Sequence, residues 1–200
     1  MISVVIPSLK PTLMQPLLES IEASIKEDYE ILVQTEPSYV NAVLSGFNKA
    51  KGDVVVIMDC DGSHNPVYFQ GMFNLLKRAD IVIGSRYVVG ARSDDVLIRR
   101  LISRFFCKCT RLLLGLQEIS DVMSGFIVIK KSVLDQLRIE TVGYKIGISI
   151  LMQANQRFTI AEYPIVFTKS KLGNYVKLRN IRDGLQTIAF IGKLFLCRII

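Results

Sequence analysis

Short apolar runs alternate with amphipathic segments along the first 84 residues of the chain. Each run is rich in β-branched residues, which is typical of buried strands, and each segment between them spaces its apolar side chains like a helix. The predicted strands cover residues 2–6, 29–33, 53–58 and 80–84, and the predicted helices cover residues 13–25, 41–51 and 68–77. Strands that alternate with helices at this spacing form a parallel sheet through right-handed crossovers. The pattern therefore predicts an α/β fold, with a mostly parallel sheet flanked by helices.

The second half of the chain is less regular, and it contains no internal repeat and no linker. Its expected elements are helices at residues 94–114, 131–137, 146–154 and 178–200, extended segments at 126–129 and 158–167, and a basic loop at 169–174. We expect one domain over residues 1–177 and an apolar, amphipathic C-terminal helix over residues 178–200. The last part, residues 188–200, is shorter than the roughly 20 apolar residues that span a bilayer. We therefore expect this helix to lie in the membrane interface, and a core helix or a dimer contact is the alternative.

The charge balance of the chain predicts an anionic partner. The chain has 25 Lys and Arg against 18 Asp and Glu, a net charge of +7, which suits nucleic acid, lipid headgroups or a phosphorylated substrate. No aromatic cluster is interleaved with the basic residues, so we do not expect nucleic acid. Four cysteines without a C-x-x-C pair and a single histidine argue against a zinc site. A mean hydropathy of +0.35 favours a membrane surface among the remaining partners.

Two aspartates, Asp59 and Asp61, directly follow the apolar strand predicted at residues 53–58. In an open parallel sheet, ligands bind beyond the carboxyl ends of the strands. Two carboxylates at such a place can share a divalent cation with a diphosphate, because Mg²⁺ completes its shell with phosphate oxygens and water. The sequence D-C-D-G is also typical of an ordinary tight turn without a ligand. Its place after a buried strand in a basic chain favours the metal site.

The stretch GFNKAKGDVVVIMDCDGSHNP, residues 46–66, resembles the donor and metal region of family 2 glycosyltransferases. Within that family it resembles the dolichyl-phosphate mannose synthases and polyprenyl-phosphate glycosyltransferases. Three further blocks match in order: ADIVIGSRYVVG, DVMSGFIVIKKSVL and residues 161–177. The resemblance implies a GT-A type, Rossmann-like fold and a metal-dependent, inverting transfer of a hexose, mannose or glucose. The donor would be a nucleotide-diphosphate sugar and the acceptor dolichyl or polyprenyl phosphate.

The resemblance also implies roles for individual residues. Asp61 and Arg86 are the expected catalytic residues, and His64 is expected to be structural. The expected ligands of Mg²⁺ or Mn²⁺ are Asp59, Asp61 and Ser63. The expected donor-binding residues are Pro7, Ser8, Glu36, Asp59, Cys60, Asp61, Arg86, Lys171 and Lys177. The expected acceptor-binding residues are Arg99, Ser103, Asp121 and Ser124.

Two stretches depart from the family pattern, and both affect the donor pocket. The first strand is followed by Pro7, Ser8 and Leu9 without the family's acidic residue, and the second ends in VQTEP, directly before the next helix. Part of the usual nucleoside-binding segment is therefore absent, and Glu36 is expected to replace an aspartate there. A degenerate, non-catalytic membrane-binding relative is the alternative that these departures leave open.

The segment from Arg86 to Arg111 carries seven basic and two acidic residues. On the helix predicted there, Arg99 and Ser103 share one face, and apolar residues occupy the opposite face. Because a basic amphipathic helix commonly lies on an anionic membrane, we expect a peripheral protein at the cytoplasmic face of a membrane. A solvated helix face is the alternative for this helix. A soluble acceptor is the alternative for the reaction, since it would need neither the basic helix nor the apolar end.

Overall fold

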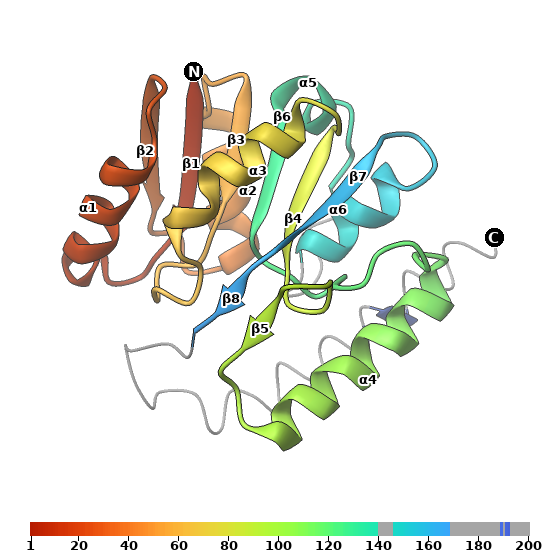
Figure 1. Ribbon diagram of the computed structural model, residues 1–200. Coiled ribbons are helices and arrows are strands. Elements are labelled where there is room, and N and C mark those ends of the chain that lie inside the picture. The colour runs from red at the N-terminus through yellow and green to blue at the C-terminus, as the bar shows by residue number, and fades with distance from the viewer. Residues whose placement is uncertain (140–145, 169–188, 190, 193–200) are drawn as a thin grey trace.

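The computed structural model describes residues 1–139, 146–168, 189 and 191–192, and a six-stranded sheet forms its centre (Figure 1). The order across the sheet is β2-β1-β3-β6-β4-β7. The strands are β1 (Ile2–Pro7), β2 (Tyr29–Gln34), β3 (Val54–Ile57), β4 (Ile81–Ser85), β6 (Ile127–Lys130) and β7 (Ile160–Pro164). Strand β6 runs antiparallel to both of its neighbours, β3 and β4, whereas the other three pairings are parallel. The prediction of a mostly parallel sheet is confirmed.

Helices cover both faces of this sheet, which explains why its strands are apolar throughout. The helices are α1 (Gln15–Ser24), α2 (Tyr39–Lys49), α3 (Phe69–Leu76), α4 (Leu97–Leu114), α5 (Lys131–Leu134) and α6 (Ile146–Ala154), with short 3-10 turns at Pro11–Leu13 and Pro66–Tyr68. On β3, Val54 and Val56 pack in one core with α1 and α3, whereas Val55 and Ile57 pack in a second core with α2 and α6. Alternate side chains of a strand point to opposite faces of the sheet. A strand that is covered on both faces therefore needs apolar side chains at successive positions.

The boundaries of several elements differ from the predicted ones. The helix expected over residues 94–114 begins only at Leu97. The residues before it form the short strand β5 (Arg92–Ser93), which pairs in parallel with β8 (Val166–Phe167), and the backbone N–H of Asp94 continues this pairing by donating to the Phe167 carbonyl at 3.0 Å. The extended segment 158–167 is divided between β7 and β8. The predicted loop 169–174 and nearly all of the predicted C-terminal helix lie outside the described residues. Of that helix, residues 189, 191 and 192 are described as helical, and Ile191 is buried in the core.

Helix α4 departs from the compact arrangement of the other helices. In Figure 1 it runs below the sheet, past β5, as the longest helix of the described residues. It ends at Gly115, whose φ of 69° is a left-handed conformation that glycine adopts readily and that closes a helix. Large apolar side chains of α4 are exposed to solvent: Leu97, Ile98, Leu101, Ile102, Phe105, Leu112 and Leu113. Among the described helices, none is both long and apolar enough to cross a membrane.

Candidate functional site

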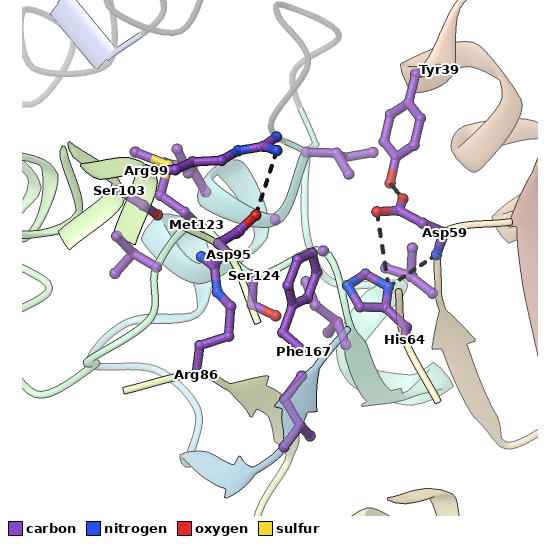
Figure 2. A pocket seen from close by; sticks show the side chains of 18 residues that line it. Tyr39, Asp59, His64, Arg86, Asp95, Arg99, Ser103, Met123, Ser124 and Phe167 are labelled. Carbon is purple, nitrogen blue, oxygen red and sulfur yellow. Dashed lines mark hydrogen bonds and ion pairs between the residues drawn. The ribbon is translucent and has the colours of Figure 1, made fainter. Parts of the chain in front are cut away.

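A cavity of about 340 Å³ opens at the carboxyl ends of β3 and β4. These two strands point the same way, so the residues that follow them, Asp59 and Arg86, meet at one edge of the sheet. Figure 2 shows Asp59 and its neighbours on one side of the cavity, Arg86 and the residues of α4 on the other, and Phe167 between them. The polar side chains that line the cavity are Tyr39, Asp59, His64, Arg86, Asp95, Arg99, Ser103 and Ser124.

The aspartate that enters the cavity from β3 is held by two aromatic residues. The hydroxyl of Tyr39, in the first turn of α2, donates to Asp59 Oδ1 at 3.1 Å, and the backbone N–H of Asp59 donates to His64 Nδ1 at 3.1 Å. His64 is buried, and its ring stacks on that of Phe126 at a centroid distance of 5.0 Å. His64 thus accepts a hydrogen bond from the backbone at the start of its own turn. This contact fits the structural role expected for His64. Tyr39 was not predicted.

The second aspartate, Asp61, does not line the cavity. It lies in the turn that follows Asp59. Its Oδ1 accepts the backbone N–H of Ser63 at 3.0 Å, and Gly62 between them has a φ of 76°. Ser63 is buried beneath this turn. One carboxylate oxygen of Asp61 thus closes the turn by a local hydrogen bond of the kind aspartate commonly makes. The roles of Asp61 and Ser63 toward a metal stay predictions.

The carboxylate of Asp59 is the acidic group on this side of the cavity that a divalent cation shared with a substrate could reach. The described residues contain no group of three His, Cys, Asp or Glu side chains that could hold a metal ion. Asp59 is 39% exposed toward the cavity, so its carboxylate is open to a ligand. Mg²⁺ is commonly held by one or two carboxylates together with substrate phosphates. This donor set therefore suits an ion that arrives with a diphosphate, and does not suit a closed protein cage.

The other described residues that were predicted to bind the donor lie at the end of β1, after β2 and, for Cys60, after β3. Pro7 and Ser8 are buried at the first of these places, and Glu36 follows β2. A hydrogen bond with Ser45 lowers the pKa of Glu36. Burial raises the pKa of the Cys60 thiol, against the lowering effect of a hydrogen bond with Ser8. None of these predicted residues lines the cavity itself, and Lys171 and Lys177 lie outside the described residues.

Arg86 is fixed by a buried carboxylate. Asp121, which is fully buried, accepts from Nε of Arg86 at 2.7 Å, from Nη2 at 2.8 Å and from the backbone N–H at 3.0 Å. Burial lowers the pKa of the Arg86 guanidinium, but the hydrogen bonds and charge of Asp121 outweigh it, and the net pKa is raised. Both Asp121 oxygens are therefore engaged by Arg86. The contact of Asp121 with the acceptor stays a prediction, and its pairing with Arg86 was not predicted.

The backbone next to the Asp121 carboxylate is held by a second carboxylate, that of Glu162. Glu162, on β7, accepts the backbone N–H groups of Ser120 and Asp121 at 2.6 and 3.0 Å. Ser124, which lines the cavity, donates its hydroxyl to the backbone carbonyl of Gly84 at 2.7 Å, and its predicted contact with the acceptor stays a prediction. The loop from residue 120 to residue 124 is thus bound to both β4 and β7. Glu162 was not predicted, although it lies within a block that resembles the glycosyltransferases.

The α4 side of the cavity contains the two residues predicted from their common helix face, Arg99 and Ser103. Arg99 Nη1 lies 3.5 Å from Asp95 Oδ1, and the Arg99 side chain is 54% exposed whereas that of Asp95 is 10% exposed. The Tyr87 hydroxyl donates to Ser103 Oγ at 2.7 Å. Asp95 and Tyr87 were not predicted. The structure therefore places Asp59 on one side of a cavity, and Arg86, Arg99 and the Asp95 that pairs with Arg99 on the other.

The chain matches a known family model and several known proteins. A model described as Glycosyl transferase family 2 matches residues 15–138. A dolichol-phosphate mannosyltransferase of Pyrococcus furiosus is 33% identical over 150 residues, which is 73% of this chain and 42% of that protein. A polyprenol monophosphomannose synthase of Mycolicibacterium smegmatis is 34% identical over 161 residues, which is 76% of this chain and 60% of that protein. The chain thus spans about half the length of these relatives.

A more distant likeness to solved structures concerns the fold alone. Glucosyl-3-phosphoglycerate synthase from Mycobacterium tuberculosis, in complex with Mn²⁺, uridine-diphosphate-glucose and phosphoglyceric acid, matches with a TM-score of 0.72. The match covers 98% of this chain and 79% of that one, at 18% sequence identity. Together with the observed sheet, it confirms the expected GT-A type fold.

Proposed function

Because the chain belongs to glycosyl transferase family 2, we propose that it transfers a hexose, mannose or glucose, from a nucleotide-diphosphate sugar to a dolichyl or polyprenyl phosphate. The observation that carries the proposal is the division of the cavity into two regions. Asp59 lies on one side, and Arg86, Arg99 and Ser103 lie on the other. The relatives named above bear the names of polyprenol-phosphate and dolichol-phosphate mannosyltransferases, which supports this choice of acceptor.

The carboxylate region is the proposed place of the donor diphosphate. Asp59 and Asp61 would hold Mg²⁺ or Mn²⁺, with Ser63 beside them, while Tyr39 keeps Asp59 oriented by its hydrogen bond. The cation, when bound, supplies positive charge that stabilises the diphosphate as it leaves. A solved structure of the same fold contains Mn²⁺ and a nucleotide sugar. Pro7, Ser8, Glu36 and Cys60 would then lie on the nucleoside side, and Lys171 and Lys177 are proposed to contact the diphosphate.

The arginine region is the proposed place of the acceptor phosphate. A phosphate monoester is already anionic near neutral pH, so one of its oxygens can attack the anomeric carbon without a general base. The new bond forms from this oxygen as the bond from the anomeric carbon to the diphosphate breaks, which inverts the configuration. The chain contributes positioning and charge stabilisation. Arg86, held by Asp121, lines the cavity, and its remaining N–H groups would lie between the two phosphates.

The exposed apolar side chains of α4 support an acceptor with a lipid tail. Leu97, Leu101 and Phe105 are each more than half exposed, and Arg99, Arg100 and Arg104 lie on the same helix. Apolar and basic side chains on one helix suit the boundary of an anionic membrane. The proposed location is therefore the cytoplasmic face of a membrane, with the protein bound peripherally. A soluble acceptor would leave this apolar surface without a use.

The proposal is tested by incubating the protein with a panel of nucleotide sugars and a polyprenyl phosphate, with and without Mn²⁺. The expected product is a polyprenyl-phosphate hexose, formed from one of the donors and dependent on the metal. Donor hydrolysis without a lipid product, or transfer only to a water-soluble acceptor, would overturn the proposed acceptor. Absence of any donor turnover would favour the non-catalytic alternative.

A further inference from the structure

The first half of α4 carries two residues of the cavity, Arg99 and Ser103, but no buried side chain. The buried residues of this helix, Cys107, Thr110 and Leu114, all belong to its second half. Packing in the core therefore fixes the end of α4 that lies away from Arg99. A phosphate site at Arg99 and Ser103, as proposed, also needs the first half of α4 to be held, because the ligands of such a site tolerate little movement.

Among the described residues, Tyr87 connects the end of β4 to this half of α4. It directly follows Arg86, and its hydroxyl donates to Ser103 Oγ at 2.7 Å, across 16 residues of chain. The guanidinium of Arg104, also on α4, lies over the Tyr87 ring at 5.3 Å from its centroid, and that of Arg86 lies 5.1 Å from the same centroid. A single aromatic side chain thus contacts both the arginine that follows β4 and the first half of α4.

The direction of the hydrogen bond matters for the chemistry. A serine hydroxyl carries one proton and accepts through its lone pairs. Because Tyr87 is the donor to Ser103, the proton of Ser103 is left to donate to another acceptor, such as a phosphate oxygen. Burial raises the pKa of Tyr87 against the lowering effect of the Arg86 charge, so the phenol keeps its proton at ordinary assay pH.

We propose that Tyr87 is a positioning residue that sets the width of the acceptor-phosphate site, by holding Ser103 of α4 at a fixed place relative to Arg86. The inference rests on the proposed function, in which Arg86, Arg99 and Ser103 bind the acceptor phosphate. It adds a specific role for a residue that touches neither substrate. It also explains why a helix so weakly packed along its first half can contribute to a defined site.

Tyr87→Phe is the direct test, because it removes the hydroxyl and keeps the ring over which both guanidinium groups lie. With farnesyl phosphate as the acceptor, the apparent KM for this acceptor should rise about two- to tenfold, the range expected for one net hydrogen bond. The KM for the nucleotide sugar should not change. In a Ser103→Ala background, Tyr87→Phe should have no further effect. Tyr29→Phe, on β2, removes the same atom away from the cavity and serves as the matched control. An equal rise for both substrates, or additive effects in the double variant, would overturn the inference.

A second measurement needs no substrate. Amide hydrogen exchange over residues 97–106 should be about two- to tenfold faster in Tyr87→Phe than in the wild type, with the strands unchanged. Unchanged exchange in this half of α4 would overturn the inference, even in a protein that transfers sugar normally. If exchange is faster but the wild-type protein transfers no sugar to a polyprenyl phosphate, the proposed function is refuted. Tyr87 would then only stabilise α4, and the inference that it positions an acceptor site would be wrong.

Discussion

Replacing Asp121 with asparagine tests whether one buried carboxylate fixes the central cation of the cavity. Asp121 is fully buried and accepts three hydrogen bonds from Arg86, of which two come from the guanidinium at 2.7 and 2.8 Å. Asparagine keeps the size of the side chain but leaves the guanidinium without a counter-charge. Breaking a buried ion pair by removing one partner costs about 3–5 kcal/mol. Since the Arg86 side chain is 13% exposed toward the cavity, where water can reach it, we expect a loss at the lower end, about 3 kcal/mol.

Urea denaturation measures this loss as a shift of the midpoint at constant slope. Asp135→Asn is the matched control, because Asp135 pairs with Lys131 one helical turn away and is 57% exposed. That exposed pair should contribute about 0–1 kcal/mol. The double variant Arg86→Gln with Asp121→Asn should recover most of the stability, since two neutral amides need no counter-charge, but it should not recover transfer. An Asp121→Asn protein that is as stable as the Asp135→Asn control would refute the reasoning.

Three further predictions concern the two regions of the cavity and the exposed helix. Arg99→Ala and Ser103→Ala should each raise the apparent KM for polyprenyl phosphate about ten- to a hundredfold, because a hydrogen bond to a charged group is worth roughly 1.5–3 kcal/mol; equal effects on the nucleotide sugar would assign α4 to general folding. Asp61→Ala should abolish metal-dependent transfer and lower the free energy of unfolding by about 0.5–1.5 kcal/mol, since it also removes the turn hydrogen bond from Ser63; full retained activity would show that the metal assignment is wrong. Phe105→Glu should weaken flotation with anionic vesicles without altering the melting temperature, since Phe105 is exposed; unchanged flotation would remove the membrane role of this surface.

The strands were predictable because burial on both faces leaves a plain signature in the sequence. Val54 and Val56 of β3 enter one core, and Val55 and Ile57 enter the other, so the run is apolar without alternation. The direction of β6 was not predictable in the same way. A buried strand has the same periodicity whether it runs parallel or antiparallel, and only the fold shows that β6 opposes β3 and β4.

Part of the site followed from local rules. Asp59 and Arg86 directly follow strands of one sheet, so their meeting at its carboxyl edge could be predicted. Arg99 and Ser103 are four residues apart on one helix, so their common face could also be predicted. Both predictions depend only on the regular spacing of residues along a strand or a helix.

The residues that support the site could not be predicted, because they act over long separations. Asp121 is 35 residues from Arg86, and Glu162 is 41 residues from Asp121. Tyr39 reaches Asp59 across 20 residues. No periodicity links such pairs, since each contact arises when distant elements dock. The resemblance to the glycosyltransferases suggested that Asp121 was important, but only the structure showed its pairing with Arg86.

The central claim is that one cavity holds a donor diphosphate beside Asp59 and an acceptor phosphate beside Arg86, Arg99 and Ser103. A crystal structure of the full chain with Mn²⁺, a nucleoside diphosphate and farnesyl phosphate tests it directly. The account predicts Mn²⁺ between the diphosphate and the carboxylates of Asp59 and Asp61, and the farnesyl phosphate group within hydrogen-bond distance of Arg99 and Ser103. A diphosphate bound without contact to either aspartate, or a farnesyl phosphate group bound away from α4, would contradict it.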